Sequence, residues 1–232
     1  MSGAYLTIPT PDGEFKAYVA RPAAATAPVV VVIQEIFGVN AVMRQVADNL
    51  AAQGYLAIAP DLFWRIEPGV DITDKSQAEW ERAFALMNAF DVDKGMEDIQ
   101  TTLTFARQMP GANGKAGVVG YCLGGKLAFL AATRTDSDAS VSYYGVGLDA
   151  HLAEVERLSR PLMLHIAEQD KFSDDAARER ILTGLKNHAQ VEVITYPDRD
   201  HAFAREGGEH YDAADAAKAN ERTVGLFKRT LG

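Results

Sequence analysis

The sequence predicts an α/β fold built on a mostly parallel, doubly wound sheet with helices on both of its faces. Residues 29–33 form a uniformly apolar, β-branched run, which is typical of a strand that is covered on both faces. Downstream of this run, strand-like and helix-like segments alternate, and that order indicates βαβ units. The length of 232 residues suits one domain of this type, so we expect a single domain over residues 1–232.

Turn-forming and helix-breaking residues mark the ends of the elements in the N-terminal half. Asp12-Gly13 is a strong turn signal between two short strands, Gly54 ends a helix and Pro60 stops a strand. The elements expected here are strands at residues 5–8, 15–21, 29–33 and 55–59, and helices at residues 41–53, 76–89 and 92–107.

The same alternation continues through the C-terminal half. The elements expected here are strands at residues 117–119, 140–144, 162–167 and 191–196, and helices at residues 125–133, 174–187 and 211–231. Ligands of such sheets lie beyond the carboxyl ends of the strands. The residues that follow each strand are therefore the candidates for a functional site.

Charge and composition limit the classes of partner. A formal net charge of -9 argues against binding to nucleic acid or to an anionic membrane, because such surfaces require basic patches. The apolar runs are too short to span a bilayer. The N-terminus lacks a basic start followed by an apolar run, so we expect no signal peptide. These features favour a cytoplasmic protein that acts on a small molecule.

Cysteine and histidine usage argues against a disulfide and against a metal site. Cys122 is the only cysteine, which leaves no intramolecular disulfide. The five histidines, at positions 151, 165, 188, 201 and 210, include no pair with the i, i+3 or i, i+4 spacing of a zinc site. We expect neither a metal nor a cofactor.

A nucleophile motif follows the strand predicted at residues 117–119. The sequence reads Gly120-Tyr121-Cys122-Leu123-Gly124-Gly125 before a helix, which matches the nucleophile elbow G-x-S-x-G with cysteine in place of serine. The glycines are needed because the turn is too tight for side chains, and the helix start favours a thiolate. A buried, inert cysteine is the alternative. The elbow predicts an α/β-hydrolase fold with Cys122 as nucleophile.

The elbow nucleophile of this fold takes its partners in the order acid, then histidine. Asp170 follows the strand predicted at residues 162–167 and His201 follows the strand predicted at residues 191–196. In a triad the histidine takes and returns a proton while the acid orients it. We predict a catalytic triad of Cys122, His201 and Asp170, with a solvated loop histidine as the alternative for His201. Three neighbouring carboxylates could replace Asp170: Glu168, Asp174 and Asp175.

An oxyanion hole in this fold uses the N–H after the nucleophile, here that of Leu123, and one from the loop after the valine-rich strand. That loop reads Gln34-Glu35-Ile36-Phe37-Gly38, and the N–H of Ile36 could serve. Beside a thiol, the Glu35 carboxylate would disfavour the thiolate and accept a bond from the S–H. On spacing alone, however, a loop acid without a catalytic role is the favoured explanation of Glu35.

With these motifs the sequence resembles the dienelactone hydrolases, also called carboxymethylenebutenolidases, essentially from end to end. The resemblance is strongest in Gln34-Glu35-Ile36-Phe37-Gly38-Val39-Asn40, Gly120-Tyr121-Cys122-Leu123-Gly124-Gly125, Tyr143-Tyr144-Gly145-Val146-Gly147 and His201-Ala202-Phe203-Ala204-Arg205. It implies a monomeric enzyme without a cofactor, which opens an unsaturated, carboxylated lactone to maleylacetate in the breakdown of chloroaromatic compounds.

The resemblance implies the same triad and oxyanion hole as the elbow motif, and it adds a role for Glu35. This carboxylate would hold the resting thiol in an inactive pose and take its proton when substrate arrives. The resemblance thus makes Glu35 an expected participant in catalysis. We also expect Tyr144, which lies in one of the shared stretches, to contact the substrate.

One region departs from the family pattern, which binds the substrate carboxylate with two arginines and a tyrosine. Arg205 matches one arginine, with a surface arginine paired with Glu206 or Glu209 as the alternative. The other arginine position carries Trp80 and the tyrosine position carries Phe84. Arg82 lies two residues from Trp80, on a different helical face. We expect Arg205 alone to secure a carboxylate, and Trp80 and Phe84 to make the opposite wall more apolar.

Three functions follow from these residues. The first is a dienelactone hydrolase, and the second is a thiol esterase or lactonase of the same fold that acts on other, possibly neutral, esters. Trp80 and Phe84 favour the second. A redox sensor built on Cys122 is the third, but it would often use a second, resolving cysteine and would leave the His–Asp pair unexplained.

Overall fold

The valine-rich run lies in strand β3 (Ala27–Ile33), whose residues are all buried in the computed structural model, which describes residues 3–232. The chain divides into two units, Met1–Val118 and Val119–Gly232. Strand β5 (Ala112–Tyr121) contains the boundary between them. The single domain expected over residues 1–232 includes two residues outside the described part and stays a prediction.

The first unit contains a sheet with the strand order β1-β2-β4-β3-β5. Strands β1 (Ala4–Thr10) and β2 (Gly13–Ala20) form an antiparallel hairpin, and β2 also pairs antiparallel with β4 (Leu56–Pro60). Strands β3 and β4 run parallel. Pro60, expected just beyond its strand, is instead the last residue of β4 and lies opposite Ala17. A proline is tolerated there because a strand end needs no further N–H donor from it.

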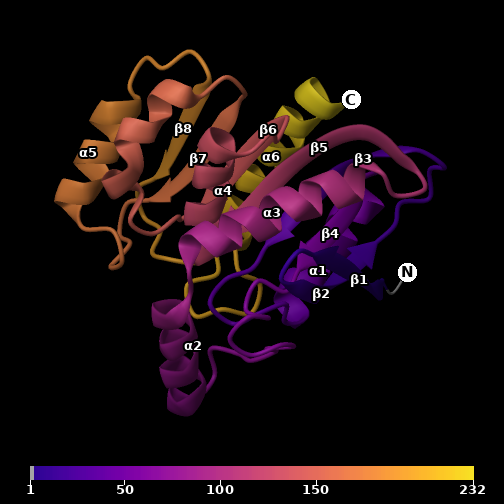
Figure 1. The fold of residues 1–232 in the computed structure, drawn as a ribbon. Coiled ribbons are helices and arrows are strands. Elements are labelled where there is room, and N and C mark those ends of the chain that lie inside the picture. Colours follow the sequence, from indigo (N-terminus) through magenta and orange to yellow (C-terminus); the bar gives the residue numbers. More distant parts are fainter. Residues whose placement is uncertain (1–2) are drawn as a thin grey trace. The chain divides into compact units, whose positions relative to one another are not determined.

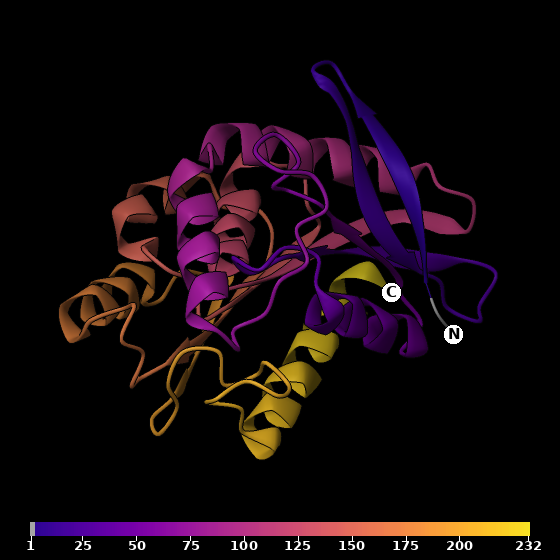
Figure 2. The same cartoon turned by 90° about the horizontal axis from the view of Figure 1, so that it is seen from below.

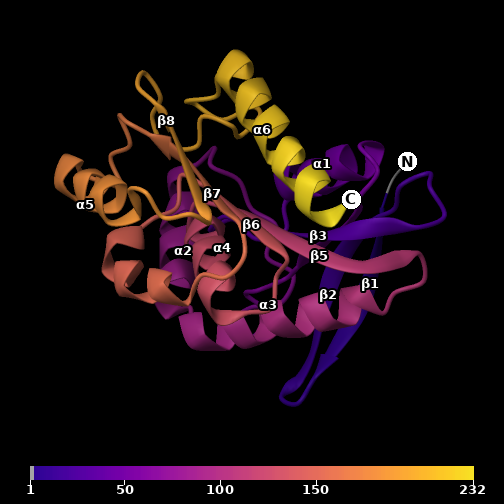
Figure 3. The same cartoon turned by 90° about the horizontal axis from the view of Figure 1, so that it is seen from above.

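The helices of the first unit are α1 (Ala41–Ala52), α2 (Gln77–Ala89) and α3 (Val92–Arg107). Each begins after a side-chain cap: Asn40, Ser76 and Asp91 accept hydrogen bonds from N–H groups of the first turn. Figures 2 and 3 show α1 and α3 on opposite faces of β3. This arrangement matches the doubly wound sheet that the alternating pattern predicts.

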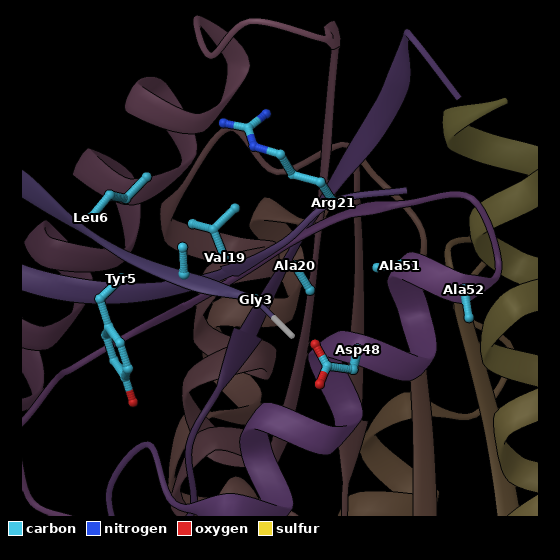
Figure 4. Close-up of a pocket in the computed structure, with 10 residues that line it drawn as sticks. Gly3, Tyr5, Leu6, Val19, Ala20, Arg21, Asp48, Ala51 and Ala52 are labelled. Carbon is cyan, nitrogen blue, oxygen red and sulfur yellow. The ribbon is translucent and has the colours of Figure 1, made fainter. Parts of the chain in front are cut away.

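A pocket of about 330 Å³ lies along β1, β2 and α1 in the first unit (Figure 4). It is lined by Gly3, Ala4, Tyr5, Leu6, Val19, Ala20, Arg21, Asp48, Ala51 and Ala52. Asp48 Oδ1 accepts a hydrogen bond from the Tyr18 hydroxyl at 2.8 Å, and Arg21 Nη1 donates to the Pro110 carbonyl oxygen at 3.0 Å. The lining residues include no cysteine, serine or histidine, so this pocket offers no nucleophile with a base.

The second unit contains the parallel strands β6 (Ala139–Tyr143), β7 (Leu162–Ala167) and β8 (Val191–Tyr196), in that order (Figure 1). Its α-helices are α4 (Leu123–Arg134), α5 (Asp175–Leu185) and α6 (Ala213–Leu231). Helices α4 and α6 lie on opposite faces of β6, as Figure 3 shows. Residues that follow β7 and β8 therefore leave the sheet at the same edge, because the strands are parallel.

Two further elements differ from the sequence-based expectation. Strand β5 begins at Ala112 rather than at residue 117, and its first residues are largely exposed, which hides them from a search for apolar runs. A 3₁₀ helix, η1 (Leu148–Arg157), occupies a stretch with no predicted element. Helices of this type lack a strong sequence signature. None of the helices within residues 3–232 combines the length and hydrophobicity needed to cross a bilayer.

Candidate active site

Cys122 lies in a strained turn between β5 and α4. Its φ is 57° and its ψ is -115°, a backbone conformation that non-glycine residues rarely adopt. A Cβ added at Gly120 would lie 1.9 Å from the carbonyl oxygen of Gly124, and one added at Gly125 would lie 2.5 Å from that of Tyr143. The Cys122 N–H also donates to the Tyr143 carbonyl oxygen at 3.1 Å. The turn therefore depends on glycines at both flanking positions.

His201 and Asp170 meet in the second unit. His201 Nδ1 and Asp170 Oδ2 are 2.8 Å apart, and Nδ1 must be the donor because a carboxylate can only accept. Both side chains are buried. Burial by itself lowers the pKa of His201, but the charges and hydrogen bonds of Cys122 and Asp170 outweigh it and raise the pKa to about 10. The structure thus brings together Cys122, His201 and Asp170.

Two of the three alternative acids, Asp174 and Asp175, have other partners. Asp174 Oδ1 accepts from the Ala177 N–H at 2.7 Å and caps helix α5, while Asp175 pairs with Arg178. Asp170 is therefore the carboxylate that faces the imidazole. Its second oxygen, Oδ1, accepts a hydrogen bond from the Phe172 N–H at 2.8 Å.

Two aromatic rings pack against His201 within the described part of the second unit. The Tyr144 ring lies 5.1 Å from the imidazole at an interplanar angle of 62°, and the Phe172 ring lies 4.7 Å away at 67°. Tyr144 has a φ of 37°, so it too follows its strand in a strained turn. Sequence reasoning missed Phe172, for which the one available signal is its position two residues after the predicted acid.

The loop that carries His201 also holds Arg205. The Arg205 side chain is buried, with 8% of its surface exposed. This burial contradicts the surface position that the alternative assumes for Arg205. The Arg205 N–H donates to the Ala202 carbonyl oxygen at 2.9 Å, and the His201 N–H donates to Asp200 Oδ1 at 2.7 Å. These bonds make the loop a closed turn with the imidazole and the guanidinium on one short segment.

Glu35 and Ile36 lie in the first unit, in the turn after β3, and both are buried. Gln34 Oε1, one residue before, accepts a hydrogen bond from the Leu62 N–H at 3.1 Å. On the other side, a Cβ at Gly38 would lie 1.9 Å from the Val70 carbonyl oxygen. The turn is therefore held by a hydrogen bond on one side and packs closely against the backbone of Val70 on the other.

The remaining predicted residues belong to helix α2 of the first unit. Trp80 and Phe84 stack with ring centroids 5.6 Å apart, and Phe37 packs edge-on against Trp80 at 5.0 Å. Arg82 forms an ion pair with Glu67 instead. The helix thus gathers an aromatic cluster of Phe37, Trp80 and Phe84, and directs its arginine to a separate partner.

The part of the chain that the structure describes contains no group of three His, Cys, Asp or Glu side chains arranged to hold a metal ion.

Comparisons with known proteins agree with the fold and the motifs. The family model of the dienelactone hydrolase family matches residues 15–231. A relative from Azospirillum brasilense is 52% identical over 222 residues, which are 95% of this chain and 96% of the relative. The carboxymethylenebutenolidase of Pseudomonas putida is 43% identical over 220 residues, which are 94% of this chain and 93% of that protein.

Solved structures give the same assignment of the fold. A protein from Klebsiella pneumoniae matches with a TM-score of 0.85 and 26% identity, over 97% of this chain and 98% of that one. The dienelactone hydrolase from Anabaena variabilis matches with a TM-score of 0.72 over the whole of both chains, at 16% identity, and so supports the fold alone. The chain therefore belongs to the dienelactone hydrolase family, a family of ester hydrolases with the α/β-hydrolase fold.

Proposed function

We propose that this enzyme hydrolyses its substrate through an acyl group carried on Cys122, with His201 as proton carrier and Asp170 as the residue that orients it. The observation that carries the proposal is the buried chain of contacts: Asp170 accepts from His201 at 2.8 Å, and His201 is hydrogen-bonded to Cys122. A nucleophile, a base and an orienting acid in this relation are what acyl transfer in two steps requires.

The proposed reaction begins when the sulfur of Cys122 attacks the carbonyl carbon of the substrate. A C–S bond forms while His201 holds the thiol proton, and the C–O bond of the ester then breaks as His201 passes that proton to the leaving oxygen. In the second step, water attacks the thioester and gives a proton to His201. The C–S bond breaks, the acid leaves, and the thiol of Cys122 recovers its proton.

The developing negative charge on the carbonyl oxygen needs N–H donors. Leu123 is the first residue of α4, where N–H groups have no partner within the helix, and this supports it as one donor. Ile36 is proposed as the second donor on the family resemblance. Its place in a closely packed turn suits a donor that must not move during the reaction.

Glu35 is proposed to restrain the resting thiol, again on the family resemblance. The pKa of His201, raised to about 10 beside Cys122 and Asp170, favours a protonated imidazole in the free enzyme, and such a cation would not by itself hold the thiol inactive. Alkylation of Cys122 by iodoacetamide without substrate distinguishes a thiol restrained by Glu35 from an unrestrained one. Slow alkylation that becomes fast in Glu35→Gln supports the restraint by Glu35. A rate equal to that of an unfolded control argues against it.

The proposed substrate is a carboxylated, unsaturated lactone, opened from dienelactone to maleylacetate, and Arg205 is its proposed carboxylate ligand. A guanidinium binds carboxylate through paired, charge-assisted hydrogen bonds. Loss of one such contact costs about 1.5–3 kcal/mol, or about ten- to a hundredfold in kcat/KM. Arg205→Ala should therefore lose more on the lactone than on its neutral methyl ester. Equal losses on both would show that Arg205 does not read the charge.

A second candidate function is hydrolysis of other, neutral esters. The aromatic cluster of Phe37, Trp80 and Phe84 favours it, because Trp80 and Phe84 replace an arginine and a tyrosine of the family pattern. In either case we propose a cytoplasmic monomer that acts on a small molecule without a cofactor.

The covalent step is tested by trapping. The wild-type enzyme, mixed with an ester that deacylates slowly, should gain the mass of one acyl group, and peptide mapping should find it on Cys122. Cys122→Ala should gain none. An adduct of equal yield in that variant would overturn the proposed nucleophile.

A further inference from the structure

Phe172 is half exposed, with 50% of its surface accessible, and its ring lies 4.7 Å from the imidazole of His201. A single exposed apolar side chain needs no explanation by itself. Its neighbour sets this one apart, because the imidazole is the proposed proton carrier. Tyr144, which packs against the same imidazole and was also expected to contact the substrate, is only 2% exposed.

The position of Phe172 is set by the same bonds that hold the proposed acid. Its N–H donates to Asp170 Oδ1 at 2.8 Å, and the Ser173 N–H donates to the Asp170 carbonyl oxygen at 3.3 Å. The Arg178 guanidinium donates to the carbonyl oxygens of Asp170 and Ser173. The ring is therefore presented by a closed turn rather than by a loose loop.

The chemistry of acyl transfer says which part of a substrate meets this ring. The imidazole must reach the leaving oxygen to protonate it, so the alcohol portion of an ester passes directly beside His201. A half-exposed aromatic ring in edge contact with that imidazole can pack against the alcohol portion. The acyl portion stays bonded to sulfur during this step.

We propose that Phe172 is a specificity-determining residue that binds the alcohol portion of the substrate and favours esters with an aromatic or apolar alcohol. This inference rests on the proposed function, since it needs His201 to act on the leaving oxygen. A compact lactone has little alcohol portion beyond its ring oxygen, so its opening should depend on Phe172 less than hydrolysis of a benzyl ester does.

The test compares methyl, cyclohexylmethyl and benzyl esters of one acid. All three pass through the same acyl-enzyme, so differences in kcat/KM arise from binding and acylation. In Phe172→Ala the ratio of kcat/KM for benzyl over methyl should fall about tenfold, as for the loss of one aromatic contact. Phe172→Leu should restore the cyclohexylmethyl ester more fully than the benzyl ester. Leu182→Ala removes another exposed apolar side chain of this unit. It should leave the ratios of kcat/KM for benzyl over methyl and for cyclohexylmethyl over methyl unchanged.

Two outcomes would overturn the inference. If Phe172→Ala loses equally on all three esters, the ring only packs against His201 and selects nothing. If neither Phe172→Ala nor Phe172→Leu changes kcat/KM on any of the three esters, the alcohol portion binds elsewhere. Trapping distinguishes these results from a failure of the proposed function. If every ester leaves an acyl adduct on Cys122 but the Phe172 variants keep the benzyl-over-methyl ratio of kcat/KM, only the role of Phe172 is ruled out. Absence of any adduct in the wild type removes the function itself.

Discussion

The turns that carry Cys122 and Asp170 both join a strand to a helix, but different forces hold them. At the elbow, Cys122 has a φ of 57°, and a Cβ at Gly120 would lie 1.9 Å from a backbone carbonyl oxygen. At the acid, the turn is closed by the Phe172 N–H, 2.8 Å from Asp170 Oδ1, and by the Arg178 guanidinium. The elbow thus depends on glycines, which have no side chain, whereas the acid turn depends on hydrogen bonds made by the Asp170 and Arg178 side chains.

This difference predicts how each turn fails. A turn built on close backbone approach cannot yield to an added atom, because a backbone carbonyl has no alternative rotamer. A turn built on side-chain hydrogen bonds loses one bond at a time and relaxes. The elbow should therefore break as a whole, whereas the acid turn should weaken in steps.

The largest effect is expected for Gly120→Ala. The added methyl group would meet the Gly124 carbonyl oxygen, so the elbow must shift, at a cost of about 3 kcal/mol and with loss of activity. Gly225→Ala in α6 is the matched control, since its nearest neighbour is the flexible end of Arg229 at 3.5 Å. Alanine in a helix interior should stabilise by up to about 1 kcal/mol. Urea unfolding of both variants checks this, and a Gly120→Ala protein as stable as wild type would contradict it.

The next effect is expected for Asp170→Asn, which keeps the shape of the turn and removes the charge. The amide can present its N–H to His201 and leave the imidazole in the wrong tautomer, so kcat should fall about 10⁴-fold. The unfolding midpoint should change far less than in Gly120→Ala. Activity within about tenfold of wild type would mean that another acid supports His201.

A smaller effect is expected for Arg178→Ala, which loosens the acid turn and leaves the three triad side chains unchanged. Misplacement of Asp170 should lower kcat by about tenfold, with KM nearly constant and the pH profile shifted because the imidazole loses part of its support. Arg178→Lys should recover part of the loss. Arg180→Ala on the same helix, which breaks only the pair with Asp149, is the control and should retain wild-type kinetics.

The same contrast explains what could be predicted from the sequence. The elbow can be predicted because its structural requirement, glycines around Cys122, lies in one short stretch of sequence. Asp170 and His201 follow from their order after parallel strands. The contact between Phe172 and His201 could not be predicted, because it joins segments 29 residues apart in sequence through the pairing of β7 with β8.

Other elements follow the same division. The stack of Trp80 on Phe84 is foreseeable from their i, i+4 spacing on a helix, whereas the ion pair of Arg82 with Glu67 needs the fold of an intervening loop. The burial of Arg205 was not foreseeable either, since charged residues in loops are usually exposed. Local geometry can thus be predicted from short motifs, whereas contacts between residues far apart in the sequence cannot.

The subtlest prediction asks which turn acts more strongly on His201. Cys122 and Asp170 both raise the pKa of His201, so both Cys122→Ala and Asp170→Asn should lower it from about 10. The charge of Cys122 is the largest of the influences that raise it, so Cys122→Ala should lower it further. Titration of the imidazole nitrogens by NMR measures both shifts. His165, whose burial lowers its pKa to about 3, should stay neutral near neutral pH in every variant and serves as the internal control. A larger shift in Asp170→Asn would mean that the acid turn, although the more adaptable of the two, dominates the electrostatics of the site.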